Sequence, residues 1–190
     1  MERIFYREGP FTRKTDGEPF LRRAAAAFAQ EQGAPFSPDT GILRTKEGKP
    51  YFTESPFSFS VSHTAGRAPW TVLWMCLFSD AARCGLDVQN MRAVPRDAVL
   101  KRFFTPEEAA LAAAGGEKGF YRLWTRREAF GKMTGEGFFG RMPDLRLAAG
   151  VWEKEPYVFR EIPAGPGVLC TACLPYEPKG AIPLSELAEL

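Results

Sequence analysis

The chain has 190 residues, of which 45% are hydrophobic and 25% are charged, and its formal net charge is +2. This length is enough for one large domain or two small ones around a buried core. A net charge of this size is too small to argue for nucleic acid as a partner by itself, and we expect none. The longest apolar run, residues 72–78, is too short to span a bilayer, and the N-terminus lacks an apolar stretch of signal-peptide length. We therefore expect a cytoplasmic protein without a membrane partner.

The cysteines are Cys76, Cys84, Cys170 and Cys173. The last two form a C-x-x-C inside VLCTACL, which is typical of a buried strand, and a strand sends residues three apart to opposite faces. No second C-x-x-C exists to complete a zinc site. We favour core thiols over a metal or redox role.

The first half of the chain predicts one helix and a β-hairpin. Residues 19–32 are alanine-rich with apolar residues at helical spacing. The segment GKPYF, Gly48–Phe52, predicts a turn that enters a strand, with Lys49 in the turn. FSFSVSH, Phe57–His63, alternates strictly, with its serines on one face. A turn then leads to the buried strand WTVLWMCLF, Trp70–Phe78, and we expect these two strands to pair.

A carboxylate interrupts the next predicted strand, CGLDVQ, Cys84–Gln89. Leu86 and Val88 point to one side of it, and Asp87 and Gln89 point to the other. A carboxylate in a core strand needs a cation, a donor or a metal as partner. An acid on an edge strand that faces water is the alternative.

Two helices follow from about Pro95. The second starts at Thr105, where the sequence T-P-E-E carries proline at the first helical position and Glu108 at the third. This is the signature of a capping box, and capping alone can explain Glu108. The glycine-rich residues 115–119 predict a break before the next helix.

The segment FYRLWTRREAFGKMTGEG, residues 120–137, predicts an amphipathic helix that its last two glycines end. Glu128 and Lys132 are four residues apart and share a face, so an exposed ion pair is the simplest explanation for them. Arg127 falls in the apolar sector, where its head needs an anion. Beyond Gly140 the pattern is again β, and the tail predicts at most one or two helical turns.

Each half therefore places a helix before antiparallel strands, one half from 1 to 83 and the other from 84 to 190. This pattern indicates an α+β fold with a duplicated unit.

Five motifs occur in order between Gly48 and Gly137: GKP, SVSHT, GLDVQ, RFFTPEE and LWTRREAFGKMTGEG. Together they resemble the motifs of the Sfp-type 4′-phosphopantetheinyl transferases, which are G-K-P, F-N-x-S-H, (I/V)G(I/V)D-x-E, R-F-F-x-x-x-E and W-(S/T)-x-K-E-(A/S)-x-x-K-x-x-G-x-G. The resemblance implies two tandem halves related by a pseudo-twofold axis, each a helix packed on an antiparallel sheet. Residues 1–83 would carry coenzyme A-binding elements, and residues 84–190 the metal site and the catalytic helix.

The resemblance also implies an activity. The family transfers the 4′-phosphopantetheine arm of coenzyme A to a serine of an apo acyl or peptidyl carrier protein and releases 3′,5′-ADP, which is a holo-acyl-carrier-protein synthase activity. It implies Mg²⁺ as cofactor, with Mn²⁺ as a substitute, coenzyme A as co-substrate and a monomeric chain. Carrier proteins are acidic around their serine, so a basic docking face is expected. Its candidates are Arg92, Arg96, Lys101 and Arg102.

The site residues are carried over position by position. Hard carboxylate oxygens suit Mg²⁺. The metal ligands implied are Asp87 and Glu128, with Gln89 as a third. The residues implied in catalysis are Asp87, Glu108, Glu128 and Lys132, with Lys132 on the pyrophosphate and the base being Glu128 or a metal-bound water near Glu108. The implied coenzyme A contacts are Lys49, Ser62, His63 and Lys132.

The sequence departs from the family pattern at several positions. Gln89 replaces the second acid of D-x-E, Ser60 replaces an asparagine, Thr64 replaces a serine, and Arg127 replaces a lysine. The basic residues that hold the 3′-phosphate in the family have no clear match. The candidates for them are Arg13, Lys14, Arg22 and Arg23.

Two other functions remain open from the sequence. A catalytically impaired module that binds coenzyme A or a carrier protein would account for Gln89 and for the missing basic residues. A metal-dependent phosphodiester hydrolase could use Asp87 and Glu128, although no larger cluster of acids or histidines accompanies them.

Overall fold

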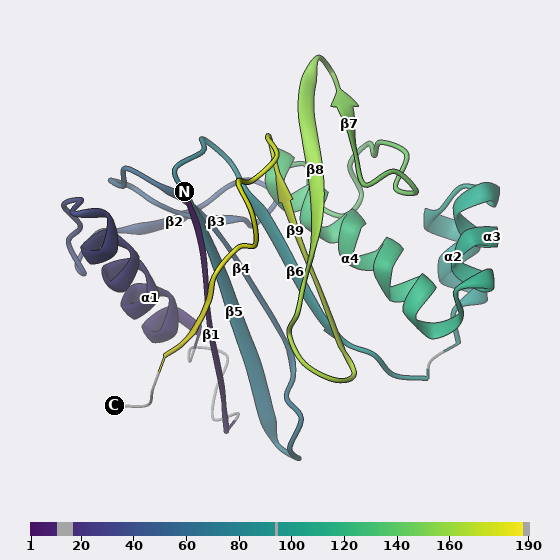
Figure 1. Cartoon of the computed structure of the whole chain (residues 1–190), viewed down its shortest axis with the longest axis horizontal. Coiled ribbons are helices and arrows are strands. Elements are labelled where there is room, and N and C mark those ends of the chain that lie inside the picture. Colours follow the sequence, from purple (N-terminus) through teal and green to yellow (C-terminus); the bar gives the residue numbers. More distant parts are fainter. Residues whose placement is uncertain (11–16, 94, 188–190) are drawn as a thin grey trace.

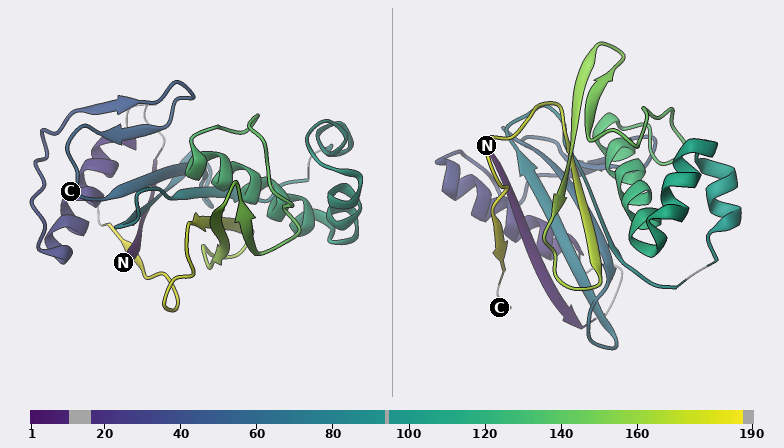
Figure 2. Two further views of the ribbon diagram at one scale, coloured as in Figure 1. Left: turned by 90° about the horizontal axis from the view of Figure 1, so that it is seen from above. Right: turned by 45° about the vertical axis from the view of Figure 1, so that its right-hand side comes forward.

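Two β-sheets lie between two helices. The computed structural model describes residues 1–10, 17–93 and 95–187. Helix α1 (Gly17–Gln32) flanks one sheet and helix α4 (Gly116–Thr134) flanks the other, as Figure 1 shows. The view from above and the view turned by 45° show the same layers (Figure 2). Within the described residues, no helix combines the length and the apolarity needed to cross a membrane.

The N-terminal sheet has the strand order β10-β1-β5-β4. Strand β1 (Glu2–Pro10) pairs antiparallel with β5 (Thr71–Ser79), and β5 pairs antiparallel with β4 (Ser58–Ala65). The β4–β5 pair is the predicted hairpin, so this prediction is confirmed. A separate two-stranded sheet, β2 (Ile42–Arg44) and β3 (Pro50–Phe52), carries the predicted GKP turn.

The C-terminal sheet has the strand order β6-β9-β8-β7. Its strands are β6 (Gly85–Asn90), β7 (Ala149–Trp152), β8 (Glu155–Ile162) and β9 (Val168–Leu174), and all neighbours are antiparallel. The spatial order β6-β9-β8 repeats the spatial order β1-β5-β4. In each half the chain forms one strand (β1 or β6), then a helical segment, then a hairpin (β4–β5 or β8–β9). The second strand of each hairpin pairs with the first strand of its half. The expected α+β fold of two related halves is confirmed.

Three consecutive helices connect β6 to β7. They are α2 (Asp97–Phe103), α3 (Pro106–Ala114) and α4. The predicted capping box at Thr105 is present and starts α3. The predicted break at residues 115–119 is wrong in extent, because only Gly115 separates α3 from α4. Helix α4 ends where predicted, at Gly135, whose φ of 83° favours glycine.

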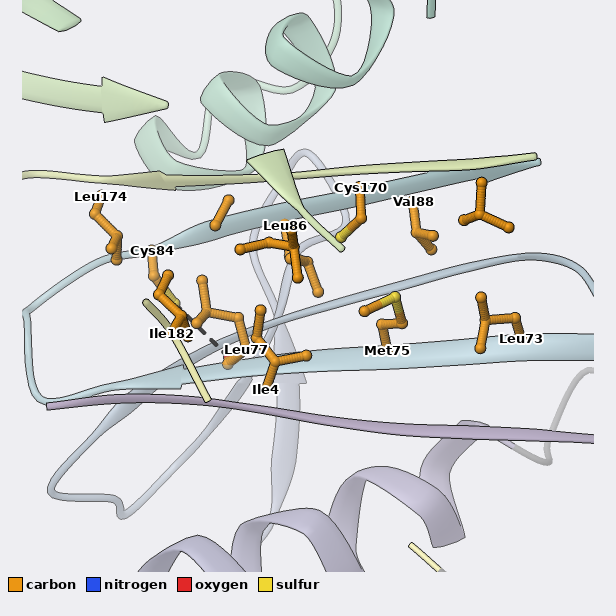
Figure 3. Close-up of a cluster of buried hydrophobic side chains, with 13 residues drawn as sticks. Ile4, Leu73, Met75, Leu77, Cys84, Leu86, Val88, Cys170, Leu174 and Ile182 are labelled. Carbon is orange, nitrogen blue, oxygen red and sulfur yellow. Dashed lines mark hydrogen bonds between the residues drawn. The ribbon is translucent and has the colours of Figure 1, made fainter. Parts of the chain in front are cut away.

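The two sheets enclose a shared hydrophobic core. Leu77 and Ile4 reach it from the N-terminal sheet, and Leu86 and Val88 reach it from β6 (Figure 3). Because side chains alternate along a strand, Asp87 between these two residues of β6 points to the other side, toward α4. The alternation of one strand thus sends apolar groups to the core and an acid toward the helix.

The edges of the two halves meet along β4 and β6 through side-chain hydroxyls. The backbone N–H groups of Leu86, Val88 and Asn90 each donate to a hydroxyl on β4, at 2.9, 3.2 and 2.9 Å. The acceptors, in the same order, are Ser60, Ser62 and Thr64. An edge strand leaves such groups without partners, so this ladder of hydroxyls satisfies them and joins the halves. We call it the hydroxyl seam.

The chain returns to the first sheet at its end. Strand β10 (Leu184–Glu186) pairs parallel with β1, and Ile182 just before it packs into the core between the sheets. Residues 179–187 of this tail contain no helix, within the expected limit of one or two helical turns, and β10 forms there because the free edge of β1 offers backbone partners that local sequence does not reveal.

Candidate active site

A cleft of about 790 Å³ lies between the two halves. It is lined by α1, the β2–β3 turn, β4, β5, β6 and α4 together with the loop that follows it. Six of the residues predicted for the site line it, and they come from both halves. These are Lys49, Ser62, His63, Asp87, Glu128 and Lys132.

Glycines allow the elements around the cleft to approach closely. A Cβ atom on Gly85 would lie 1.8 Å from the carbonyl oxygen of Ala129, so only glycine lets β6 run against α4 here. A Cβ on Gly131 would lie 2.4 Å from the carbonyl oxygen of Gly137, where the loop folds back on the helix. The glycines of these motifs therefore bring Asp87 to the face of α4.

Asp87 is buried, with 2% of its surface exposed, and each of its carboxylate oxygens has at least one hydrogen-bond partner. Its Oδ1 accepts from the Lys132 ammonium at 2.9 Å and from the Ser62 hydroxyl at 2.9 Å. Its Oδ2 accepts from the Gln89 side-chain amide at 3.1 Å. The alternative of an edge-strand acid that faces water is therefore wrong, and the predicted need for a cation and donors is confirmed.

Lys132 pairs with Asp87 rather than with Glu128. Its ammonium also donates to the Ser62 hydroxyl at 3.1 Å and to the carbonyl oxygen of Leu86 at 2.9 Å. The explanation of Glu128 and Lys132 as an exposed ion pair on one helix is thus not what the structure shows, because β6 places a buried carboxylate closer to the ammonium.

Glu128 lines the cleft with its carboxylate free of hydrogen bonds from the described residues. Burial raises the pKa of this carboxyl above its ordinary value, and the negative charge of Asp87 raises it further. Two carboxylates that disfavour each other's charge in one cleft would both be stabilised by a cation between them.

The pair of carboxylates fits a Mg²⁺ ion that keeps other positions for water and phosphate oxygens. Glu18 and Glu47 also line the cleft, but the described residues contain no cluster of three or more histidine, cysteine or acidic side chains that could hold a metal, so the predicted pair Asp87 and Glu128 stays a proposal for the metal ligands. Gln89 reaches the site through its amide nitrogen on Asp87, and it does not line the cleft. Ligation through its oxygen stays a prediction.

Glu108 is placed away from the cleft. Its two carboxylate oxygens accept from the backbone N–H groups of Thr105, at 3.0 Å, and of Leu145, at 2.9 Å. It is buried, with 4% of its surface exposed. These contacts support a capping role for Glu108. A catalytic role for Glu108 stays a prediction, which these contacts do not favour.

A second lysine, Lys49, lines the cleft within electrostatic range of Lys132. The Lys49 ammonium donates to the carbonyl oxygen of Cys84 at 3.0 Å. Burial lowers the pKa of Lys49, and the charge of Lys132 lowers it further. A bound anion would relieve this repulsion, so the lysines suit a phosphorylated ligand.

His63 stacks on Trp74, with ring centroids 4.3 Å apart. Burial lowers the pKa of His63, and the positive charge of Lys132 lowers it further, so its neutral form is favoured at pH 7. Two residues of the cleft, Trp74 and Arg44, were not foreseen from the sequence. Arg44 lies opposite Pro50 in the β2–β3 pair, so the GKP turn was the signal that could have indicated it.

The remaining basic candidates have other partners or lie outside the described residues. Arg22 donates to Glu18 and to two backbone carbonyl oxygens. Arg96 pairs with Glu117 and lies over the rings of two aromatic residues, so it is not a free member of the docking face. Arg23 does not line the cleft. Arg13 and Lys14 fall among the residues that the structure does not describe.

The head of Arg127 meets carbonyl oxygens and aromatic rings in place of the expected anion. It donates to the carbonyl oxygens of Phe138, at 3.0 Å, and Phe103, at 2.8 Å. It also lies within 6.0 Å of three phenylalanine rings. Arg127 thereby ties the loop after α4 to the end of α2, beside the cleft.

Comparisons with known proteins agree with this arrangement. The model of the 4′-phosphopantetheinyl transferase superfamily matches residues 83–159, which include Asp87 and Glu128. A 4′-phosphopantetheinyl transferase of Bacillus subtilis is 32% identical over 141 residues, which are 71% of this chain and 57% of that relative. The 4′-phosphopantetheinyl transferase HetI of Nostoc sp. is 27% identical over 171 residues, covering 76% of this chain and 68% of HetI.

A putative 4′-phosphopantetheinyl transferase of Synechocystis sp. is 36% identical over 115 residues, which are 54% of this chain and 44% of that relative. The chain therefore matches between about two fifths and two thirds of these relatives' lengths. The family match, the relatives and the repeated α+β topology agree, and the chain is similar to the 4′-phosphopantetheinyl transferases over these parts of its length.

Proposed function

We propose that this chain transfers the 4′-phosphopantetheine arm of coenzyme A to a serine of an apo acyl or peptidyl carrier protein and releases 3′,5′-ADP. The observation that carries the proposal is the meeting of Asp87, Glu128 and Lys132 in one cleft between the halves. The relatives' names support the same activity.

The reaction is a displacement at the β-phosphate of coenzyme A, with the carrier serine as nucleophile. Such transfers depend on positioning and on neutralisation of charge more than on covalent help from the protein. Lys49 and Lys132 supply positive charge to the diphosphate. A Mg²⁺ ion held by Asp87 and Glu128, or Mn²⁺ in its place, would supply further charge neutralisation at the phosphates.

Proton transfer falls to Glu128 in this proposal. Glu128 lines the cleft with its carboxylate free of hydrogen bonds from the described residues, so it can accept the proton of the serine hydroxyl. His63, which is held neutral and stacked on Trp74, serves as a donor to phosphate rather than as the base.

A mass measurement on the carrier protein tests the proposal. The full chain is incubated with coenzyme A, Mg²⁺ and an apo carrier protein, and we expect the carrier to gain the mass of one phosphopantetheine arm. The gain should disappear with a chelator and with Asp87→Asn or Glu128→Gln. Glu54→Gln, on the exposed surface and outside the cleft, should keep it.

The same assay separates the alternatives. An impaired binding module would bind coenzyme A and leave the carrier mass unchanged. A phosphodiester hydrolase would consume a model phosphodiester without any carrier protein. The monomeric state, the cytoplasmic location and the lack of nucleic-acid and membrane partners stay predictions from the sequence.

A further inference from the structure

Three phenylalanines form a partly exposed cluster at the edge of the cleft. The ring centroids of Phe103 and Phe138 lie 5.0 Å apart, and that of Phe139 lies 5.4 Å from Phe138 and 5.7 Å from Phe103. Phe138 lines the cleft, whereas Phe139 lies outside the lining with 79% of its surface exposed. We call these three residues the aromatic rim.

The exposed ring of Phe139 belongs to a larger apolar surface. Phe103 and Phe138, which it contacts, are themselves only partly buried. Single exposed apolar residues are ordinary on a protein surface, whereas a contiguous apolar patch marks an interaction site. Aromatic side chains are also enriched at the centres of protein–protein contacts.

Arg127 fixes the backbone on both sides of the aromatic rim. Its guanidinium donates to the carbonyl oxygens of Phe138 and Phe103, at 3.0 and 2.8 Å, and lies 5.0 Å from the centroid of the Phe138 ring. The loop after α4 and the end of α2 are thereby joined. A surface that is ordered before its partner arrives loses less conformational entropy on binding.

Positive charge borders the aromatic rim. Lys101 and Arg102 are exposed on α2, and neither forms an ion pair with the described residues. The Arg102 guanidinium lies 5.1 Å from the centroid of the Phe103 ring. The surface therefore combines an apolar centre with a basic edge, which complements a partner that is both apolar and acidic.

We infer that the aromatic rim is a docking surface for the carrier protein, with Phe139 as its central contact and Lys101 and Arg102 as its basic edge. This inference rests on the proposed function. The carrier serine has to reach the phosphates in the cleft, so the carrier covers the edge of the cleft to which Phe138 belongs. The centre of the docking face is then aromatic, and its charged residues lie at the border.

Direct binding of carrier proteins tests the inference. An apo acyl carrier protein and an apo peptidyl carrier protein are each labelled with a fluorophore, and fluorescence anisotropy gives their Kd for the full chain. For a carrier that the wild type binds, we expect Phe139→Ser to raise Kd by about tenfold or more, because it removes the central apolar contact. Phe139→Leu keeps an apolar side chain and should stay within about threefold of the wild type.

Val151→Ser is the matched control. Val151 is 69% exposed and lies on β7, at the opposite edge of the C-terminal sheet from β6, so its Kd for the carrier should equal that of the wild type. In transfer assays, Phe139→Ser should raise the KM for the carrier protein without raising the KM for coenzyme A.

A double variant, Lys101→Gln with Arg102→Gln, separates the basic edge from the apolar centre. It should weaken carrier binding at low ionic strength and match the wild type in about 1 M NaCl, where the Debye length is about 3 Å. The loss of affinity in Phe139→Ser should persist in both conditions, because salt does not screen an apolar contact.

Three results would overturn the inference. The first is a Kd of Phe139→Ser within about twofold of the wild type. The second is an equal loss of affinity in Val151→Ser. The third is a higher KM for coenzyme A in Phe139→Ser with unchanged carrier binding, which would make Phe139 a contact of the coenzyme.

The binding measurement also separates this inference from the proposed function. A wild type that binds a carrier protein and transfers nothing would refute the proposed function, and the Kd values of the variants would still decide the role of the aromatic rim. A wild type that neither binds nor modifies either carrier protein would overturn the inference itself. Where transfer occurs without measurable anisotropy, the KM for the carrier protein decides.

Discussion

Asp87 and Lys132 form the most consequential contact of the molecule at the scale of single residues. The carboxylate is almost completely buried, and 25% of the lysine side chain is exposed. A buried carboxylate without its cation is costly, so each group depends on the other for stability.

A double-mutant cycle on this pair follows directly. Lys132→Met should lower the free energy of unfolding by about 1–3 kcal/mol, because it leaves Asp87 charged and without its ammonium. It should also lower kcat by about a hundredfold, since a cation beside the reacting phosphates is lost. Adding Asp87→Asn should recover part of the stability and none of the activity. Strictly additive changes in the unfolding free energies, measured by urea titration, would show that the pair is not coupled.

The sequence was informative about these residues and silent about their contacts. The spacing of Glu128 and Lys132 on a helix and the acid in the strand GLDVQ were visible, and the family resemblance selected them. The contacts of Lys132 and Ser62 were not visible, because they depend on the register between β4 and β6, which belong to different halves.

The capping box at the start of α3 matters at the scale of elements. Thr105 and Glu108 exchange hydrogen bonds with each other's backbone, and Glu108 also accepts from Leu145 N–H. One carboxylate thus begins a helix and anchors the loop that leads from α4 to β7.

This geometry predicts a structural role for Glu108. Glu108→Ala should lower the free energy of unfolding by about 1–3 kcal/mol, since two backbone donors lose their acceptor. Mn²⁺ affinity should stay within about twofold of the wild type, because the acid makes only these structural contacts. Glu54→Ala, at an exposed acid outside the cleft, is the control and should change neither quantity. Loss of Mn²⁺ binding by folded Glu108→Ala would instead return this acid to the metal site.

Elements with strong local signals were predicted well, and the exceptions have physical reasons. The hairpin, the capping box and the end of α4 depend on alternation, on T-P-E-E and on glycine, all of which are local. The start of α4 was placed too late, because Gly116 and Gly119 disfavour a helix by propensity while packing against α3 stabilises it. Strand β10 has three residues and exists only because β1 offers an edge.

At the scale of the whole molecule, the two halves share one topology and pack against each other. The contacts between them are the hydrophobic core between the two sheets, the hydroxyl seam between β4 and β6, and strand β10, which returns to pair with β1. The cleft forms only where the halves meet, so anything that separates them should damage the site. Ile182 is a useful probe, because it belongs to the C-terminal segment and fills the core between the sheets with 6% of its surface exposed.

Ile182→Ala should lower the free energy of unfolding by about 2–4 kcal/mol, because it leaves a cavity between the two sheets. Leu147→Ala, at a residue that is 52% exposed, is the control and should change it by no more than about 0.5 kcal/mol. Chemical denaturation of the two variants gives both values. Equal changes in the unfolding free energy of the two variants would mean that the C-terminal segment around Ile182 does not stabilise the packing of the two halves.

The duplicated unit was visible in the sequence as a repeated order of helix and strands. The packing of the two halves against each other was not visible in the sequence, because it depends on contacts between the hydroxyls of β4 and the free edge of β6. These contacts determine the geometry of the site.

The central claim is that one acid from β6 and one from α4 bind a single divalent ion in the cleft. Equilibrium titration with Mn²⁺, followed by its paramagnetic resonance signal, measures this directly. We expect one ion per chain in the wild type and a loss of affinity of more than about tenfold in both Asp87→Asn and Glu128→Gln. A wild type that binds no Mn²⁺, or either variant binding it as tightly as the wild type, would contradict the claim.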